Sequence, residues 1–179
     1  MSTSFETPAS SLETKPGTPD FGPATDLVCR ECGASYALGA AYACIECFGP
    51  LEVGYDLSAV TRELIESGPQ NMWRYSCLLP VAPYAGEERN LNPGLTRLVR
   101  ADNLAAALGM TGTLWVKDDS GNPTHSFKDR VVAVAQSAAR RLGLGTIACA
   151  STGNLANAVA AAAARAGQDS VVVIPSNLE

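Results

Sequence analysis

The sequence predicts an α/β fold in which helices cover both faces of a parallel sheet, preceded by a small segment that carries four cysteines. From residue 113 onward, short apolar runs alternate with longer segments of helical character. This alternation favours right-handed crossovers between parallel strands. The last apolar run, residues 171–174, reads Val-Val-Val-Ile without polar alternation, as expected of a strand that is buried on both faces.

The composition excludes several classes of function. The chain has 179 residues, of which 46% are hydrophobic and 17% charged, and its net charge is −5. No basic cluster suits a phosphate backbone, so we expect no nucleic-acid partner. No apolar run reaches the roughly 18 residues of a membrane span, so we expect a cytoplasmic protein without a membrane partner. Residues 1–25 mix Ser, Thr, Pro and acidic residues, which predicts a disordered leader.

Residues 26–56 contain two Cys-x2-Cys pairs, Cys29 with Cys32 and Cys44 with Cys47. Because a reducing compartment keeps thiols reduced, this spacing favours metal binding over a disulfide framework. Four thiolates complete a tetrahedral zinc site and leave no position for water, which predicts structural Zn²⁺ in a zinc-ribbon-like segment. Metal binding would supply much of the folding free energy of so small a segment. The alternative is four reduced structural thiols.

Residues 57–179 are expected to form the first part of a larger α/β catalytic domain. Ser58 is a candidate N-cap for the first helix, and Gly109 is the expected end of the second. The aromatic residues Trp73 and Tyr75 are interpreted as packing residues. The elements expected before the regular alternation begins are a short helix at 56–67, an edge strand at 96–101 and a helix at 103–108.

The regular part of the pattern follows. Gly143 and Gly167 are expected to end two helices, because glycine adopts the left-handed conformation of a C-terminal cap without strain. The sequence stops directly after the last strand, so we interpret it as the front part of a longer polypeptide. The expected elements are strands at 113–117, 146–150 and 170–174 and helices at about 126–142 and 155–166.

Lys128 is the strongest candidate for a catalytic residue. It begins a helix directly after a strand and a polar turn, and ligands of open α/β sheets bind at the carboxyl ends of strands. The positive end of the helix dipole and partial burial both favour the neutral amine, which attacks an aldehyde. The placement therefore predicts Schiff-base chemistry. Asp129 and Arg130 are interpreted as structural, and Ser126 as a helix cap, a cofactor contact or both.

A second polar turn, from Ser151 through Thr152 and Gly153 to Asn154, follows the strand at 146–150. Its hydroxyls and backbone N–H groups at a helix start suit an anion such as a substrate carboxylate, and the Asn154 amide suits a ring oxygen. A plain helix cap is the alternative. His125 is the only histidine in the chain, and both a packing role and a proton-transfer role are left open.

These residues resemble a known family. Residues 122–130, Asn-Pro-Thr-His-Ser-Phe-Lys-Asp-Arg, closely resemble the cofactor-lysine motif of the threonine synthases, in the fold-type II (tryptophan synthase β-like) group of pyridoxal-phosphate enzymes. Residues 150–154 resemble the asparagine loop of that group. The four-cysteine segment and residues 73–75 resemble the N-terminal part of some threonine synthases, so the resemblance covers residues 26–179.

The resemblance implies conversion of O-phospho-L-homoserine and water to L-threonine and phosphate, with pyridoxal 5′-phosphate as cofactor. Lys128 would hold the cofactor covalently and move protons between substrate carbons. Asn154 would bond the cofactor's ring oxygen, with Ser126 a further cofactor contact, and Ser151 and Thr152 would face the substrate carboxylate. The expected partner is this small-molecule substrate, and a homo-oligomer is left open. The electron sink belongs to the cofactor.

Three departures from the family pattern stand out. Many relatives have glycine in place of His125, and Arg97 stands where a Gly-x-Thr-Pro-Leu pattern has proline. The glycine loop for the cofactor phosphate and the residue facing the pyridine nitrogen would lie beyond Glu179, so this fragment alone is expected to be inactive. The alternatives are another fold-type II enzyme (threonine dehydratase, cysteine synthase or cysteate synthase) and a non-catalytic zinc-ribbon binding module.

Overall fold

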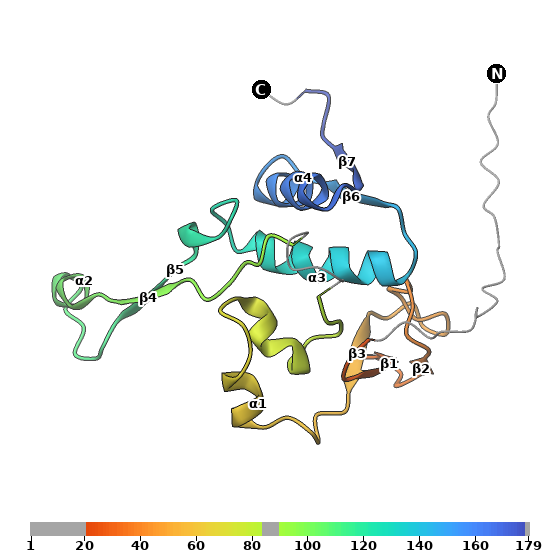
Figure 1. Ribbon diagram of the computed structural model, residues 1–179, viewed down its shortest axis with the longest axis horizontal. Coiled ribbons are helices and arrows are strands. Elements are labelled where there is room, and N and C mark those ends of the chain that lie inside the picture. The colour runs from red at the N-terminus through yellow and green to blue at the C-terminus, as the bar shows by residue number, and fades with distance from the viewer. Residues whose placement is uncertain (1–20, 84–89, 178–179) are drawn as a thin grey trace.

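The computed structural model describes residues 21–83 and 90–177, which form a mixed α/β structure (Figure 1). Residues 1–20 of the expected leader lie outside this part of the chain. The last residues of the leader differ from the expectation, because strand β1 (Ala24–Cys29) begins inside residues 1–25. Among the described residues, no helix has both the length and the apolar character that crossing a membrane requires.

Cys29, the first residue of the first cysteine pair, lies in a three-stranded antiparallel sheet. Strands β2 (Ser35–Tyr36) and β3 (Leu51–Tyr55) pair on either side of β1, in the order β2-β1-β3. Cys29, the last residue of β1, pairs with the first residue of β3. The sheet ends within one residue of the predicted boundary at 56.

The first helix is shorter than predicted and has a different cap. Helix α1 spans Arg62–Glu66, and the Thr61 hydroxyl accepts the Leu64 N–H at 3.1 Å. The prediction of Ser58 as the cap is wrong, because the Ser58 N–H donates to the Asp56 carboxylate at 2.9 Å. An aspartate that bonds the N–H group two residues later forms a turn, and this turn delays the start of the helix.

The next segment places an aromatic residue in the core. The 3₁₀ helix η1 spans Met72–Leu78. Trp73 is only 3% exposed and packs in a cluster with Met72 and Ala133, which confirms its predicted packing role. Tyr75 is 42% exposed and is not part of this cluster, so its interpretation as a core packing residue is wrong for the described residues.

Strands β4 (Arg97–Arg100) and β5 (Trp115–Asp118) form an antiparallel pair and are connected through helix α2 (Asp102–Ala107). The prediction that the strand at 113–117 joins the parallel sheet is wrong for the described residues, because β5 pairs there with β4 alone. An alternation of apolar runs and helical segments predicts that a strand exists, but it does not indicate which other strand it pairs with. In Figure 1 this pair and α2 extend to the left as an arm.

The predicted parallel unit is present. Helix α3 (Lys128–Arg141) leads to strand β6 (Thr146–Ala150), and helix α4 (Asn154–Ala166) connects β6 to strand β7 (Asp169–Val173). The two strands are parallel and pair from Thr146↔Asp169 to Ala150↔Val173. As predicted, glycines in the left-handed conformation follow both helices, Gly143 with φ 74° and Gly167 with φ 62°.

The main core lies where α3, α4 and β6 meet. Ile147 of β6 is buried there, and Cys149 on the same face of the strand packs against the cluster, whereas Ala148 and Ala150 on the other face are exposed. The prediction that residues 171–174 are buried on both faces is wrong for the described residues, since all four are exposed. The cluster contains Val132, Ile147, Ala158, Val159, Ala162 and Ala163.

Candidate functional site

The turn before α3 is anchored by a buried asparagine. Strand β5 leads through the short 3₁₀ helix η3 (Asp119–Gly121) to Asn122, which is 2% exposed. Its Oδ1 atom accepts the N–H of Gly94 at 3.0 Å. This contact ties the turn to a segment that lies 28 residues earlier in the chain.

A carboxylate closes the turn around Lys128. Asp129, which is 3% exposed, accepts the Thr124 N–H on Oδ2 at 2.8 Å and the Thr124 hydroxyl on Oδ1 at 2.7 Å. Both oxygens of one side chain therefore hold one residue of the turn. Because Asp129 directly follows Lys128 and Thr124 precedes it, these two hydrogen bonds fix the backbone on both sides of the lysine.

An ion pair joins the same helix to the first residue of η3, directly after β5. Arg130 donates to both carboxylate oxygens of Asp119, at 2.6 and 2.8 Å, and the Thr96 hydroxyl donates to Asp119 at 2.6 Å. These hydrogen bonds, that of Arg130 first, lower the pKa of Asp119 to about 2. The pair agrees with the interpretation of Arg130 as structural, and its partner is Asp119 rather than the adjacent Asp129.

Lys128 is the first residue of α3 and is partly buried. Its backbone N–H donates to the buried Ser126 hydroxyl at 3.1 Å. The prediction of Ser126 as the helix cap is wrong, because Phe127 is the N-cap of α3 and makes no side-chain cap hydrogen bond. Its Nζ atom lies 4.3 Å from the centre of the Phe127 ring. Within the described residues, no carboxylate forms an ion pair with the Lys128 amine.

His125 has an unusual backbone conformation, with a φ of 59°. Its Nδ1 atom lies 2.7 Å from the Ser120 carbonyl oxygen, so this nitrogen is the donor and Nε2 is left for other contacts. Glycine adopts this left-handed conformation without strain, which agrees with the glycine that the family resemblance implies at this position.

The second polar turn lies at the carboxyl end of β6, as predicted. The Ser151 N–H donates to the Val173 carbonyl at 3.2 Å, and the Gly153 N–H donates to the Ser151 hydroxyl at 3.3 Å. Thr152 and Asn154 are exposed, and Asn154 is the first residue of α4.

The two polar turns are brought level by the packing of α3 on α4. Gln136 Nε2 donates to the Ala162 carbonyl at 2.8 Å, and Arg140 Nη2 donates to the Ala166 carbonyl at 2.6 Å. Both contacts join residues 26 apart, which means that the helices run in the same direction with a constant offset. The same offset places Lys128 level with Asn154, at the first turn of each helix.

The four predicted metal ligands come together. The sulfur atoms of Cys29, Cys32, Cys44 and Cys47 all lie within 4.8 Å of one another, with Cys29 and Cys47 3.5 Å apart and Cys32 and Cys44 3.6 Å apart. A zinc ion about 2.3 Å from each sulfur in a tetrahedron implies sulfur separations of about 3.8 Å. All four are free cysteines, so the set fits a zinc ion.

The two cysteine pairs have matching backbone turns. The N–H groups of Gly33 and Phe48 donate to the carbonyls of Cys29 and Cys44, each at 3.0 Å. Both donors have left-handed backbones, with φ of 76° at Gly33 and 61° at Phe48. The turns approach closely at Gly49, where a Cβ atom would lie only 3.0 Å from the Cys29 sulfur.

One cysteine has a partner that the spacing did not predict. The Tyr36 hydroxyl lies 2.9 Å from the Cys44 sulfur, and this contact, as the largest effect, lowers the pKa of Cys44 to about 6. The same contact raises the pKa of Tyr36 to about 12. The Glu46 N–H also approaches this sulfur, at 3.4 Å.

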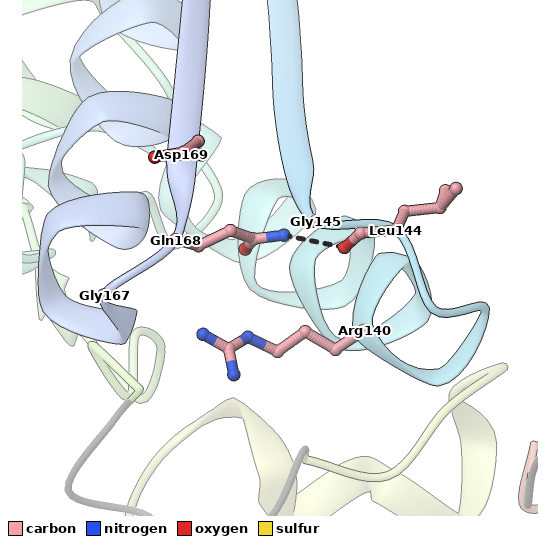
Figure 2. Close-up of a pocket in the computed structure, with 6 residues that line it drawn as sticks. All are labelled: Arg140, Leu144, Gly145, Gly167, Gln168 and Asp169. Atoms are coloured by element: carbon pink, nitrogen blue, oxygen red, sulfur yellow. Dashed lines mark hydrogen bonds between the residues drawn. The ribbon is translucent and has the colours of Figure 1, made fainter.

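A cavity of about 280 Å³ lies at the opposite end of the helices, between the loops that follow α3 and α4 (Figure 2). Arg140 lies twelve residues after Lys128 on α3, or about 18 Å along the helix axis. Gln168 bridges the loops by donating to the Leu144 carbonyl at 3.2 Å. None of the predicted catalytic or ligand-binding residues lines it; the lining residues are Arg140, Leu144, Gly145, Gly167, Gln168 and Asp169.

The lysine turn and the parallel helix unit lie inside a region with a known family signature. The pyridoxal-phosphate dependent enzyme family matches residues 90–179, which include Lys128 and the turn at 151–154. The chain therefore belongs to the pyridoxal-phosphate dependent enzyme family, and the predicted fold-type II α/β class is confirmed.

More specific similarity is to threonine synthases. That of Methanosarcina acetivorans is 40% identical over 153 residues, which is 84% of this chain and 37% of the relative. That of Methanocaldococcus jannaschii is 37% identical over 151 residues, 82% of this chain and 37% of the relative. That of Halalkalibacterium halodurans is 46% identical over 85 residues, 48% of this chain and 23% of the relative. The chain therefore spans well under half the length of these curated relatives.

Proposed function

We propose that the chain is part of a threonine synthase, which converts O-phospho-L-homoserine and water to L-threonine and phosphate. The observation that carries the proposal is that Lys128 and Asn154 are the first residues of α3 and α4, inside the region matched by the family. The threonine synthases among its relatives support the choice of reaction.

The residues fit a pyridoxal 5′-phosphate site. Lys128 is partly buried, and its amine forms no ion pair with a carboxylate among the described residues, which suits an amine that binds an aldehyde. Asn154 is exposed at the start of α4 and offers an amide to a ring oxygen. Ser126 supports the lysine backbone and is a further cofactor contact in this proposal. When bound, the cofactor supplies an electron sink for carbanion chemistry.

The chain's own residues hold the substrate and move protons. Lys128 is the base on this chain that is placed to carry protons between substrate carbons. Ser151 and Thr152, at the positive end of the α4 dipole, bind and orient the substrate carboxylate. The hydrogen bonds of Asp129 and Arg130 keep the backbone at Lys128 fixed while its side chain transfers protons.

The test uses the full-length protein, its Lys128→Ala variant and its Lys128→Arg variant, which keeps the positive charge but cannot link to an aldehyde. We expect the wild type to gain a visible absorption band with pyridoxal phosphate and to release phosphate from O-phospho-L-homoserine, and both variants to lose both properties. Phosphate release by Lys128→Arg at the wild-type rate would refute the role of Lys128. Formation of 2-oxobutyrate from threonine, without phosphate release, would instead identify a threonine dehydratase.

We further propose that Cys29, Cys32, Cys44 and Cys47 bind one structural Zn²⁺. The mutual distances of the four sulfur atoms support this proposal, and four protein ligands leave no open position for catalysis. Because the thiols need to stay reduced, we place the protein in the cytoplasm.

Metal analysis tests the zinc proposal. The double variant Cys29→Ser/Cys32→Ser should lose a stoichiometric zinc, and the matched variant Cys77→Ser/Cys149→Ser, which alters cysteines outside the cluster, should keep it. A wild-type protein that is metal-free and fully folded would refute the site.

A further inference from the structure

The four sulfur atoms of the cysteine cluster have unequal surroundings. Cys29 and Cys44 are 2% and 1% exposed, whereas Cys32 and Cys47 are exposed. Among the described residues, Cys44 is also the one member of the cluster whose sulfur contacts a hydroxyl group, that of Tyr36 at 2.9 Å. The cluster therefore has one sulfur that is both buried and held by an outside side chain.

The sheet directs Tyr36 toward this sulfur. Tyr36 lies in β2 directly opposite Leu27 of β1, and Cys29 lies two residues after Leu27. Because side chains alternate along a strand, Leu27 and Cys29 point to the same face, and directly opposite residues of paired strands share a face. Tyr36 therefore extends on the face that carries Cys29, and its hydroxyl reaches Cys44 in the second pair.

The direction of the hydrogen bond follows from the chemistry of a metal ligand. A cysteine that binds zinc does so as a thiolate, which accepts hydrogen bonds but cannot donate. The phenol is then the donor, and a donor to a ligand atom fixes its orientation and disperses the excess negative charge of four thiolates around a divalent ion.

We propose that Tyr36 is a positioning residue of the metal site, which holds the Cys44 sulfur in place for the metal and so sets the zinc affinity. The inference rests on the proposed zinc site. It adds a fifth residue, outside the four ligands, whose loss weakens metal binding while all four sulfurs remain.

The chain offers a matched control in the same segment. Tyr42 is 83% exposed, and within the described residues its hydroxyl contacts no cysteine. The variants Tyr36→Phe and Tyr42→Phe each remove a single hydroxyl group and keep the ring. A difference between them therefore reports the hydrogen bond to Cys44 and not the loss of a tyrosine.

The experiment measures zinc affinity of the full-length protein and both variants by competition with a chromophoric chelator. We expect Tyr36→Phe to lower the affinity about 10- to 100-fold, as loss of a partner of a ligand atom does, and Tyr42→Phe to leave it unchanged. With Co²⁺ in place of zinc, the sulfur-to-metal charge-transfer band should move to lower energy in Tyr36→Phe alone, because a sulfur without its donor gives up electron density more easily.

The outcomes separate the two proposals. Equal affinities and equal Co²⁺ spectra for the two tyrosine variants, with zinc bound in the wild type, would overturn the role of Tyr36 and leave the zinc site standing. A wild type that binds neither metal would overturn the zinc site and the role of Tyr36 together.

Discussion

Replacing Asp129 by alanine should unfold the turn that precedes Lys128. The substitution removes the acceptors for the Thr124 N–H and the Thr124 hydroxyl, which lie 2.8 and 2.7 Å from the carboxylate oxygens. A hydrogen bond to a charged group contributes about 1.5–3 kcal/mol, so the two together predict a loss of about 3–6 kcal/mol in the free energy of unfolding. This is a large part of the roughly 5–15 kcal/mol that stabilises a typical domain.

Urea unfolding followed by tryptophan fluorescence measures this loss, because Trp73 packs against Ala133 of α3 and is 3% exposed. The Asp129→Asn variant keeps one acceptor oxygen and should lose about half as much. The control is Asp102→Ala, which removes an exposed ion pair with Arg100 and should lose at most about 1 kcal/mol. If Asp129→Ala is no less stable than Asp102→Ala, the hydrogen bonds from Thr124 to Asp129 do not stabilise the turn.

Three further predictions concern other parts of the chain. Gly49→Ala should lower zinc affinity in a chelator competition, because the new Cβ would lie 2.7 Å from the Glu31 side chain and 3.0 Å from the Cys29 sulfur, whereas Gly39→Ala, whose nearest contact would be 3.9 Å away, should not. Thr61→Ala should lower the free energy of unfolding in urea by about 1 kcal/mol through loss of the α1 cap, and Ser58→Ala should have a smaller effect; the reverse order would restore Ser58 as the cap. Arg130 lowers the pKa of Asp119 to about 2, so Asp119 contributes stability that is present above its ordinary pKa near 4 and is lost as the pH falls toward 2. The difference in unfolding free energy between wild type and Asp119→Asn should therefore shrink over that pH range, and a constant difference would contradict the assignment.

The elements that the sequence predicted best are those specified by local signals. Helices α3 and α4 and strand β6 lie close to their expected positions, because apolar periodicity and a following glycine both act within a few residues. Strand pairing is a different kind of property. Strand β5 pairs with β4 across α2, and nothing in the residues of either strand distinguishes that partner from a parallel one.

The features of the candidate sites also divide into those that local sequence patterns predict and those that depend on contacts between distant residues. The spacing of the four cysteines and the position of Lys128 at a helix start are local patterns, and the structure brings the cysteine sulfurs together. The contacts that support these residues are not local. Tyr36 reaches Cys44 across a loop of seven residues, and Arg130 reaches Asp119 across the whole turn, and neither pair has a spacing typical of a motif.

The level placement of Lys128 and Asn154 depends on contacts made farther along the same helices. The face that α4 presents to α3 is built largely from alanines, and such small side chains leave few ridges to resist sliding along the axis. Gln136, which is buried, and Arg140 each donate to a backbone carbonyl of α4 with the same offset. A shift of one turn would break both hydrogen bonds at once and leave the buried amide of Gln136 without this partner. The register that aligns the two polar turns is therefore set by these two anchors, about 12 and 18 Å from Lys128 along α3.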